Sequence, residues 1–283
     1  MPDQVTRDNK PMTDEQLKAV AIANINTSDS STPTTSYPTE IVQLPSKGKL
    51  YPKGHPLKEG TIEMKYMTAK EEDILTNQSF INSGVVLDKL FQALIVTPID
   101  YNDLLVGDKN AIMVAARVLG YGKEYPITIQ SPNTNEKIEH TVDLTQLKDK
   151  EIDWTLLEDG KNEFTFELPA SKHVVTLRLL THRIQKKIDA ETKGLAKLKK
   201  NATLTTMLKH VIVGVDGETD NIKTRRFVDN DLLAIDSRAL RKYLKTITPD
   251  IDLSLEIPDG ESGDTFRSQL PIGLDFFWPD TEV

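Results

Sequence analysis

The sequence predicts an α+β fold in which helical and β-rich parts follow one another along the chain. Apolar residues recur at helical spacing before residue 122 and again from 181 to 247. Between 125 and 180, apolar and polar residues alternate in two pairs of segments, and a turn sequence separates the members of each pair. We therefore expect a mixed helical N-terminal unit, a β-hairpin region, a helical section and a closing pair of strands.

Residues 1–39 are predicted to be a flexible N-terminal arm. Thr13 and Gln16 fit a capping box at the start of a short helical pattern that ends near Ile25. The segment 27–39 consists almost entirely of Ser, Thr and Pro, which is too polar to bury and too rich in helix breakers for regular structure. The arm either has no role or folds on a partner.

Residues 40–124 are predicted to form a mixed unit with three helices. Short strands are expected at 41–44 and 61–66, separated by turn sequences. Thr68 and Glu71 fit a second capping box at the start of the first helix. The expected helices run from Ala69 to about Asn77, from Leu87 to Val96 and, with Asp108 as N-cap, from Lys109 to Leu119.

Residues 125–180 are predicted to hold two β-hairpins. The first pairs 125–129 with 137–142 across the turn SPNTNE. The second pairs 163–168 with 173–180 across the turn PASK.

Residues 181–248 form the predicted helical section and residues 249–283 the predicted C-terminal strands with an aromatic end. The expected helices run from Thr181 to about Lys200, from Thr203 to about Val211 and from about Asp229 to Ile247. The expected strands lie at 253–257 and 270–278, on either side of the loop PDGESGD.

The composition excludes several classes of protein. The chain has 35 Lys and Arg against 43 Asp and Glu, a net charge of -8, which disfavours a general nucleic-acid-binding protein. It has no cysteine, so disulfides, thiolate metal sites and cysteine nucleophiles are excluded. No apolar run is long enough for a membrane span, and the first residues lack the apolar region of a secretory signal. We expect a cytoplasmic protein with no membrane partner.

None of the common catalytic motifs occurs in the sequence. A glycine-rich phosphate loop, G-x-S-x-G, H-E-x-x-H and a calcium-binding loop are all missing. The five histidines include no pair at the three- or four-residue spacing of a helical metal site. We expect a protein that is not an enzyme and has no catalytic, cofactor-binding or metal-binding residues. The alternative is an enzyme whose dispersed site the sequence does not reveal.

The segment 182–200 is a predicted basic amphipathic helix. Such a helix binds nucleic acid, lipid headgroups or an acidic protein, or it is only a solvated surface. Six acids and no Lys or Arg lie between Thr246 and Phe266, and this separation of charge suits docking onto a second copy or a neighbouring protein. The candidate partner-binding residues are Lys186, Lys187, Lys197, Lys199 and Lys200.

The C-terminus gathers three aromatic residues, Phe276, Phe277 and Trp278, in a chain with 6% aromatics. Large aromatic side chains most often fill a hydrophobic core. They also serve as exposed anchors for a partner, where Trp and Phe contribute much of the binding free energy. Both alternatives are open, and the three residues are the second group of candidate partner-binding residues.

Several motifs in order resemble the baseplate hub assembly proteins and hub subunits of T-even-type contractile-tailed phages. The resemblance covers residues 40–147 well and 250–280 more loosely. In that family a C-P-x-C turn often stands where this chain has Ser131 to Thr134, so the chain has the position of a zinc ribbon without its cysteines. The motifs are LPSKGKLYP (44–52), MTAKEEDIL (67–75), Gly107-Asp108, Arg117, Tyr121-Gly122, Tyr125, VDLTQL (142–147) and FFWPD (276–280).

The resemblance implies a late, non-enzymatic protein of virion assembly, made in the cytoplasm of the infected bacterium. It would help to build the central baseplate hub of the tail by binding other tail proteins, namely hub or tape-measure proteins, or itself. One role is a structural component that stays in the virion tail baseplate. The other is a tail assembly chaperone for the tape-measure protein that is absent from the mature virion.

Overall fold

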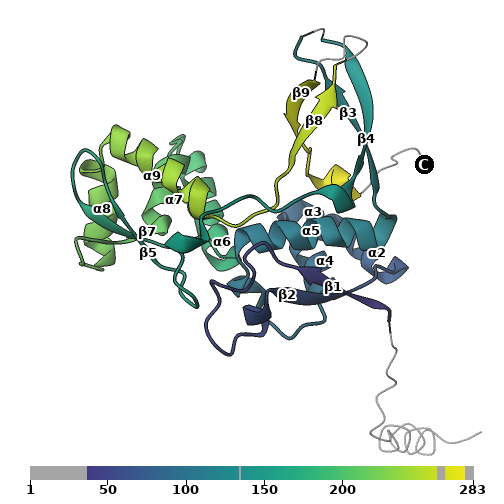
Figure 1. The fold of residues 1–283 in the computed structure, drawn as a ribbon, viewed down its shortest axis with the longest axis horizontal. Helices are drawn as coiled ribbons and strands as arrows, with labels where there is room; N and C mark the ends of the chain where they lie inside the picture. The colour runs from purple at the N-terminus through teal and green to yellow at the C-terminus, as the bar shows by residue number, and fades with distance from the viewer. Residues whose placement is uncertain (1–36, 134, 260–264, 278–283) are drawn as a thin grey trace, which may run out of the picture. The chain divides into compact units, whose positions relative to one another are not determined.

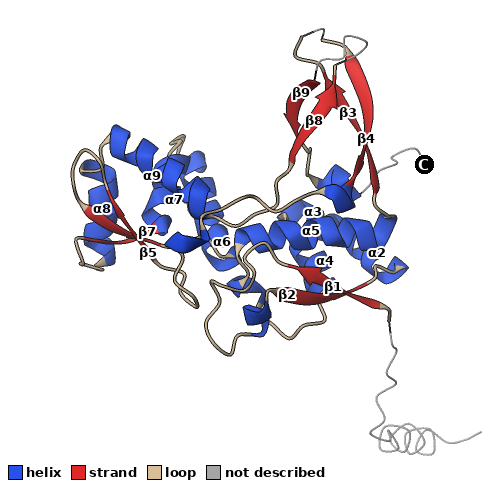
Figure 2. Ribbon diagram, viewed as in Figure 1, coloured by secondary structure: helices blue, strands red, loops and turns tan. Residues whose placement is uncertain are grey.

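The computed structural model describes residues 37–133, 135–259 and 265–277. The chain forms two compact units, Met1–Tyr37 and Pro38–Val283, and the predicted arm lies almost entirely outside the described residues. The second unit combines helices with small antiparallel sheets (Figures 1 and 2), which confirms the predicted α+β class. Its finer division into four parts stays a prediction.

Helix α5 (Val106–Tyr121) is the central element of the N-terminal half of this unit. The antiparallel strand pair β1 (Thr39–Gln43) and β2 (Thr61–Lys65) lies near it, with alternate residues of β2 buried as the two-residue period requires. Three helices follow β2: α2 (Ala69–Leu75), α3 (Gln78–Ser83) and α4 (Val86–Leu94). The sequence did not predict α3.

Asn77, the expected end of the first helix, is in fact the start of a further helix that the sequence did not predict. Its side-chain Oδ1 accepts hydrogen bonds from the backbone N–H groups of Ser79 (3.0 Å) and Phe80 (3.2 Å), so it is the N-cap of α3. Helix α2 therefore ends at Leu75, two residues before the expected end. The predicted capping box of α2 is present, since Glu71 accepts from the backbone N–H of Thr68 (3.1 Å).

The sequence predicted Asp108 as the N-cap of α5. In the structure Asp108 instead lies in the first turn of α5, where its buried side chain anchors a loop. Its carboxylate accepts hydrogen bonds from the backbone N–H of Ser46 (3.0 Å) and from the hydroxyl of Tyr51 (2.7 Å). The backbone N–H of Leu105 donates to the same hydroxyl (3.1 Å). Burial raises the pKa of Asp108, and these donors act against that rise. The contacts attach the loop 44–52 to the start of α5.

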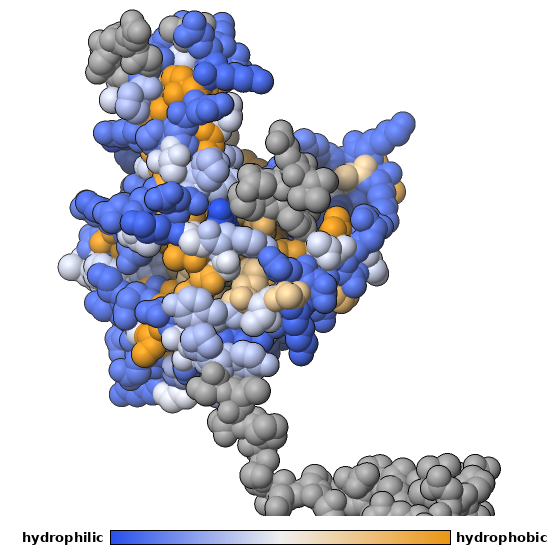
Figure 3. All heavy atoms as spheres, turned by 90° about the vertical axis from the view of Figure 1, so that its right-hand side faces the viewer, coloured by the Kyte–Doolittle hydropathy of each residue, from blue (hydrophilic) through white to orange (hydrophobic). Residues whose placement is uncertain are grey.

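Two β-hairpins lie side by side beyond the end of α5 (Figure 2). Strand β3 (Glu124–Gln130) pairs with β4 (Lys137–Asp143), as predicted, and β8 (Ser254–Pro258) pairs with β9 (Thr265–Gln269). Asn133 in the first hairpin donates to Asp259 in the second (2.6 Å). Hydrophobic side chains reach the surface among the polar residues of this end of the molecule (Figure 3).

The sequence predicted a final strand at 270–278. The described residues of this segment, 270–277, form no strand. The partner of β8 is β9, which lies nearer along the chain, and Leu274–Phe277 form a short 3₁₀ helix. The rings of Phe276 and Tyr125 make an edge contact with centroids 4.8 Å apart. Aromatic packing, rather than strand pairing, determines the course of this segment.

The helical section carries a small sheet that the sequence predicted only in part. Strands β5 (Phe164–Glu167) and β6 (Val174–Leu177) form the expected hairpin, and the unexpected strand β7 (Ile212–Val215) pairs with β6. The helix predicted from about Asp229 to Ile247 is confirmed from Ala234 on. Its predicted start is wrong, because the chain breaks at Asp231 to Leu233, and the helix before this break was not predicted. The helices are α6 (His182–Lys197), α7 (Thr203–Val211), α8 (Asn221–Asn230) and α9 (Ala234–Ile247).

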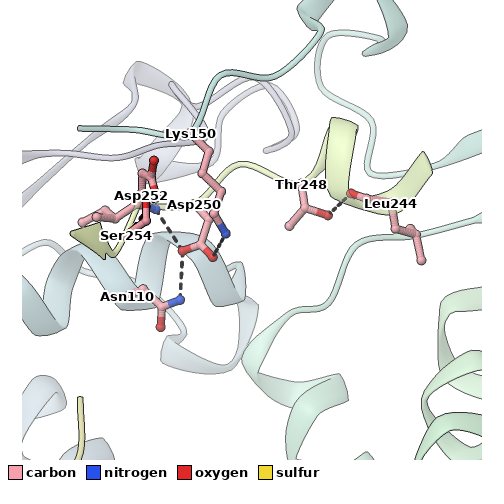
Figure 4. A network of polar contacts seen from close by, with 8 residues as sticks. Asn110, Lys150, Leu244, Thr248, Asp250, Asp252 and Ser254 are labelled. Atoms are coloured by element: carbon pink, nitrogen blue, oxygen red, sulfur yellow. Dashed lines mark hydrogen bonds and ion pairs between the residues drawn. The ribbon is translucent and has the colours of Figure 1, made fainter. Parts of the chain in front are cut away.

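The segment 249–252 connects α9 to β8 and passes directly over the start of α5. An ideal Cβ on Gly107 would lie 1.8 Å from the carbonyl oxygen of Pro249, so only glycine permits this approach. Asp250 accepts hydrogen bonds from Asn110 of α5 (2.9 Å) and from Lys150 (2.9 Å), as Figure 4 shows. This crossing joins the helical section to the N-terminal half and to the hairpins.

Candidate functional site

Helix α6 separates an apolar inner face from a cationic outer face. Ile184 and Ile188 are buried, and the lysines between and after them are exposed, as the 3.6-residue period of the helix requires. Within the described residues no ion pair reaches these lysines, whereas Arg183 pairs with Asp100 and Asp103. The exposed cations are Lys186, Lys187, Lys193 and Lys197 on the helix and Lys199 and Lys200 just after it.

The two acids of α6 do not neutralise this face. Glu191 accepts a hydrogen bond from Arg225 of α8 (2.5 Å) and lies 2.9 Å from Nε2 of His210 of α7. Burial opposes ionisation of Glu191, but His210 and Arg225 outweigh it, so its pKa lies below its usual value. Asp189 accepts from Gln185 one turn earlier (2.7 Å). Glu191 is therefore engaged within the chain, whereas Asp189 is exposed and keeps its charge, and the lysines are in excess on this face.

The cationic face of α6 borders a groove of about 450 Å³ against the α3–α4 turn. Apolar side chains of Ile81, Val86 and Leu87 line one wall, and the other wall is lined by Lys186 and Lys193 with the single acid Asp189 between them. The groove can take an apolar side chain while its rim attracts negative charge. The sequence did not predict that the α3–α4 turn and α6 would lie on opposite sides of one groove.

A polar cluster lies at the base of this groove. Lys109 donates to Asp88 (2.6 Å), and its Nζ lies 3.4 Å from Nδ1 of His182. Because lysine can only donate, this Nδ1 is the acceptor, and the other ring nitrogen of His182 donates to Asp88 (3.2 Å). Burial and the nearby charge of Lys109 lower the pKa of His182, so the ring is neutral at pH 7. The cluster holds α4, α5 and α6 together.

A Schellman motif ends α6 and places its last two lysines. The backbone N–H of Lys200 donates to the carbonyl of Leu195 (3.0 Å), and that of Lys199 donates to Ala196 (2.9 Å). The φ of Lys199 is 56°, in the left-handed region that glycine normally occupies. Both lysines are exposed beside the partly exposed side chain of Leu198.

The acid-rich segment predicted as the complementary docking surface is largely engaged within the chain. Asp250 is bonded to α5, Asp252 accepts from Ser254 (2.6 Å), and Asp259 is buried beneath the first hairpin. Glu256 pairs with Arg267 (3.3 Å). Residues 260–264 lie outside the described part. Asp250 and Asp259 thus serve contacts within the fold, while Asp252 and Glu256 stay exposed.

The two described aromatic candidates at the C-terminus are in the hydrophobic core. Phe276 and Phe277 are fully buried, with ring centroids 5.4 Å apart, and Phe277 also contacts Phe91 of α4. The core alternative therefore describes them, and their rings are not exposed to a partner in this conformation. Trp278 lies outside the described residues.

The motif residues noted in the sequence also have structural partners. Arg117 is buried and donates to the carbonyl oxygens of Gly122 (3.3 Å) and Glu124 (3.5 Å), while its guanidinium lies over the ring of Tyr125. It thus fixes the passage from α5 into the first hairpin. In the described ranges, no three His, Cys, Asp or Glu side chains lie close enough to hold a metal ion, and no helix there is long and apolar enough to cross a membrane.

Comparison with known proteins gives one match. A family model described as T4 bacteriophage base plate protein matches residues 37–268, which is more than half of the chain. No curated protein and no solved structure matches.

Proposed function

Because the chain belongs to the family of T4 bacteriophage base plate proteins, we propose that it builds the central hub of the baseplate by docking the cationic face of α6 onto an acidic surface of another tail protein. The family assigns it a structural or assembly role in the baseplate of a phage tail. The hub position and the docking face are the additional steps of this proposal.

The observation that supports docking is the exposed and unpaired state of the α6 lysines. A solvated helix surface usually mixes both signs of charge, whereas here Glu191 pairs with Arg225 and the exposed Asp189 stands against six exposed lysines. Cations that lack internal partners need not break an ion pair within the chain before they bind an external anion. The groove beside Lys186 and Lys193 adds a place for an apolar side chain of the partner.

We propose that this work is not enzymatic. Hub or tape-measure proteins are the expected partners, and protein binding in the infected bacterium needs no catalytic site, cofactor or metal. The protein is either a component of the virion tail or a chaperone that leaves after assembly. Mass spectrometry of purified virions separates these roles, because only a component is present at a fixed ratio to other tail proteins.

Reversal of three lysines tests the docking face. The change Lys197→Glu with Lys199→Glu and Lys200→Glu should block tail assembly and leave the fold intact, because exposed charges each contribute less than about 1 kcal/mol to stability. The readouts are the yield of infectious phage and the amount of complete tails. Circular dichroism of the purified variant checks the fold.

A matched control carries the same change in net charge elsewhere. Lys53→Glu, Lys70→Glu and Lys137→Glu alter exposed lysines outside the helical section and should leave phage yield unchanged. Normal plaque formation by the α6 variant, or an equal loss with the control, would end the docking proposal.

A further inference from the structure

Helix α9 carries a second cationic face that the sequence analysis did not single out. Arg238, Lys242 and Lys245 follow one another at spacings of four and three residues, so they lie in one stripe along the helix. Arg241 lies beside this stripe, and Ile235 at its N-terminal end has 63% of its surface exposed. These side chains surround a shallow depression of about 600 Å³ on α9.

The opposite face of α9 packs against the rest of the chain. Leu240 and Ile247 are buried, and Tyr243 stacks on Phe166 with ring centroids 4.5 Å apart. The one acid of the helix, Asp236, is fully buried and accepts hydrogen bonds from the backbone N–H groups of Ala170 (2.8 Å) and Ser171 (3.0 Å). The outer face is therefore purely cationic, and in the described part of the chain no ion pair neutralises it.

This face belongs to a part of the chain whose charge is opposite to that of the whole. Residues 181–248 contain 15 Lys and Arg against 8 Asp and Glu, a net charge of +7, while the complete chain has -8. Seven of these eight acids accept hydrogen bonds or ion pairs from groups within the chain. The cations of α9 therefore outnumber the acids that could pair with them, and they can bind an anionic partner.

We propose that this face of α9 binds an acidic amphipathic helix of a protein partner, at a site separate from α6. The stripe from Ile235 to Lys245 extends about 15 Å along the helix, which matches about three turns of a partner helix. Carboxylates at three- and four-residue spacing on such a helix would meet Arg238, Lys242 and Lys245 in turn. An aliphatic side chain of the partner would pack on Ile235.

Two features favour a protein helix over a nucleic acid. The uncharged residues of the face are aliphatic, Ile235 and Ala239, whereas single-stranded nucleic acid is held by stacking on aromatic rings. The remaining residues of the chain carry a net charge of -15, which would repel a long polyanion but not a short acidic segment. A protein with docking faces on both α6 and α9 can bridge two neighbours.

Binding of designed peptides to the full-length protein tests the site. The first probe is an 18-residue helical peptide with glutamates along one face around a single leucine. The second has the same composition with the glutamates spread around the helix, and the third is an 18-base-pair DNA duplex. Fluorescence anisotropy should show binding of the first probe about tenfold tighter than of the second or third.

Variants assign the binding to α9. Arg238→Glu with Lys242→Glu should weaken binding of the patterned peptide at least about tenfold, and Ile235→Ser should weaken it about threefold without changing its salt dependence. The charge-matched control Lys53→Glu with Lys70→Glu and the α6 variant Lys187→Glu with Lys197→Glu should each stay within about twofold of wild type. Circular dichroism confirms that every variant is folded.

Four outcomes would overturn the proposal. They are no binding of the patterned peptide, equal binding of both peptides, tighter binding of the duplex, and a loss in the control or α6 variant as large as in the α9 variant. The phage assay of the α6 lysines is independent of this measurement, so the two proposals stand or fail separately.

Discussion

Lys199 combines a strained backbone with an exposed charge at the end of α6. Its φ of 56° lies in the left-handed region, which disfavours residues that have a Cβ atom. The Schellman hydrogen bonds around it hold the chain in this conformation. Glycine would relieve the strain but remove a cation from the face that we propose for docking.

Replacement of Lys199 by glycine should therefore stabilise the protein. The change Lys199→Gly removes a penalty of about 1 kcal/mol and should raise the thermal midpoint by about 2 °C. Differential scanning calorimetry measures this shift. Lys200→Gly, at the next exposed position, is the control and should give no increase. An unchanged or lower midpoint for Lys199→Gly would show that the left-handed residue carries no strain.

Buried charge at single residues also stabilises contacts between elements. Asp108 joins the loop 44–52 to α5, and Asp236 joins the loop after β5 to α9. Hydrogen bonds from backbone N–H groups hold the pKa of Asp236 below its usual value even though burial acts in the opposite direction. Removing either carboxyl would leave buried donors without an acceptor, which costs more than the loss of an exposed ion pair.

At the scale of elements, the contact between α5 and the connector 249–252 brings together backbone segments that are distant in sequence. Gly107 allows the carbonyl of Pro249 to lie where a side chain would otherwise begin. Asn110, one turn later, holds the same connector through Asp250. The helical section and the hairpins are joined through this contact.

Gly107 of α5 and Gly194 of α6 should respond in opposite ways to replacement by alanine. Gly107→Ala requires a backbone shift and should destabilise the protein by about 1–3 kcal/mol. Gly194→Ala on α6 meets no atom within 4 Å and should stabilise it by about 1 kcal/mol, because alanine is the better helix former. Urea unfolding of both variants measures the two changes. Equal effects would mean that the connector does not constrain Gly107.

At the scale of the whole molecule, charge is divided between a cationic helical section and an acidic remainder. The net charge of the whole chain is -8, and this value does not reveal that residues 181–248 carry a net charge of +7. Local charge, and not the net value, governs what such a surface attracts at distances of about 8–10 Å in physiological salt. The acidic total therefore does not describe the faces of α6 and α9.

This division predicts unusual behaviour in chromatography. At pH 7.5 and low salt, the protein should bind a sulfonate cation exchanger despite its net negative charge, because the exposed cations lie together. Reversing Lys187, Lys197, Arg238 and Lys242 to Glu should abolish retention. Reversing Lys53, Lys70, Lys137 and Lys148 gives the same net charge and should preserve it. Loss of retention in both variants would contradict a localised cationic surface.

Local patterns in the sequence predicted the elements whose determinants lie within a few residues. The hairpin of β3 and β4, the capping box of α2 and the amphipathic division of α6 are of this kind. In each case the turn, the cap or the 3.6-residue period is complete within one short segment. The exposed lysines of α6 follow from the same period, and so does the cationic stripe of α9.

Tertiary contacts decided which polar and aromatic residues are available to a partner. Asp108 has the sequence of an N-cap but the position of a buried anchor, because Ser46 and Tyr51 reach it from more than fifty residues away. The sequence left both a core and a surface position open for Phe276 and Phe277, and contact with Phe91 and Tyr125 places them in the core. Periodicity and caps depend on neighbours along the chain, so the sequence alone determined these elements. Burial and ion pairing depend on residues that only folding brings together, so the tertiary structure decided which surfaces are free.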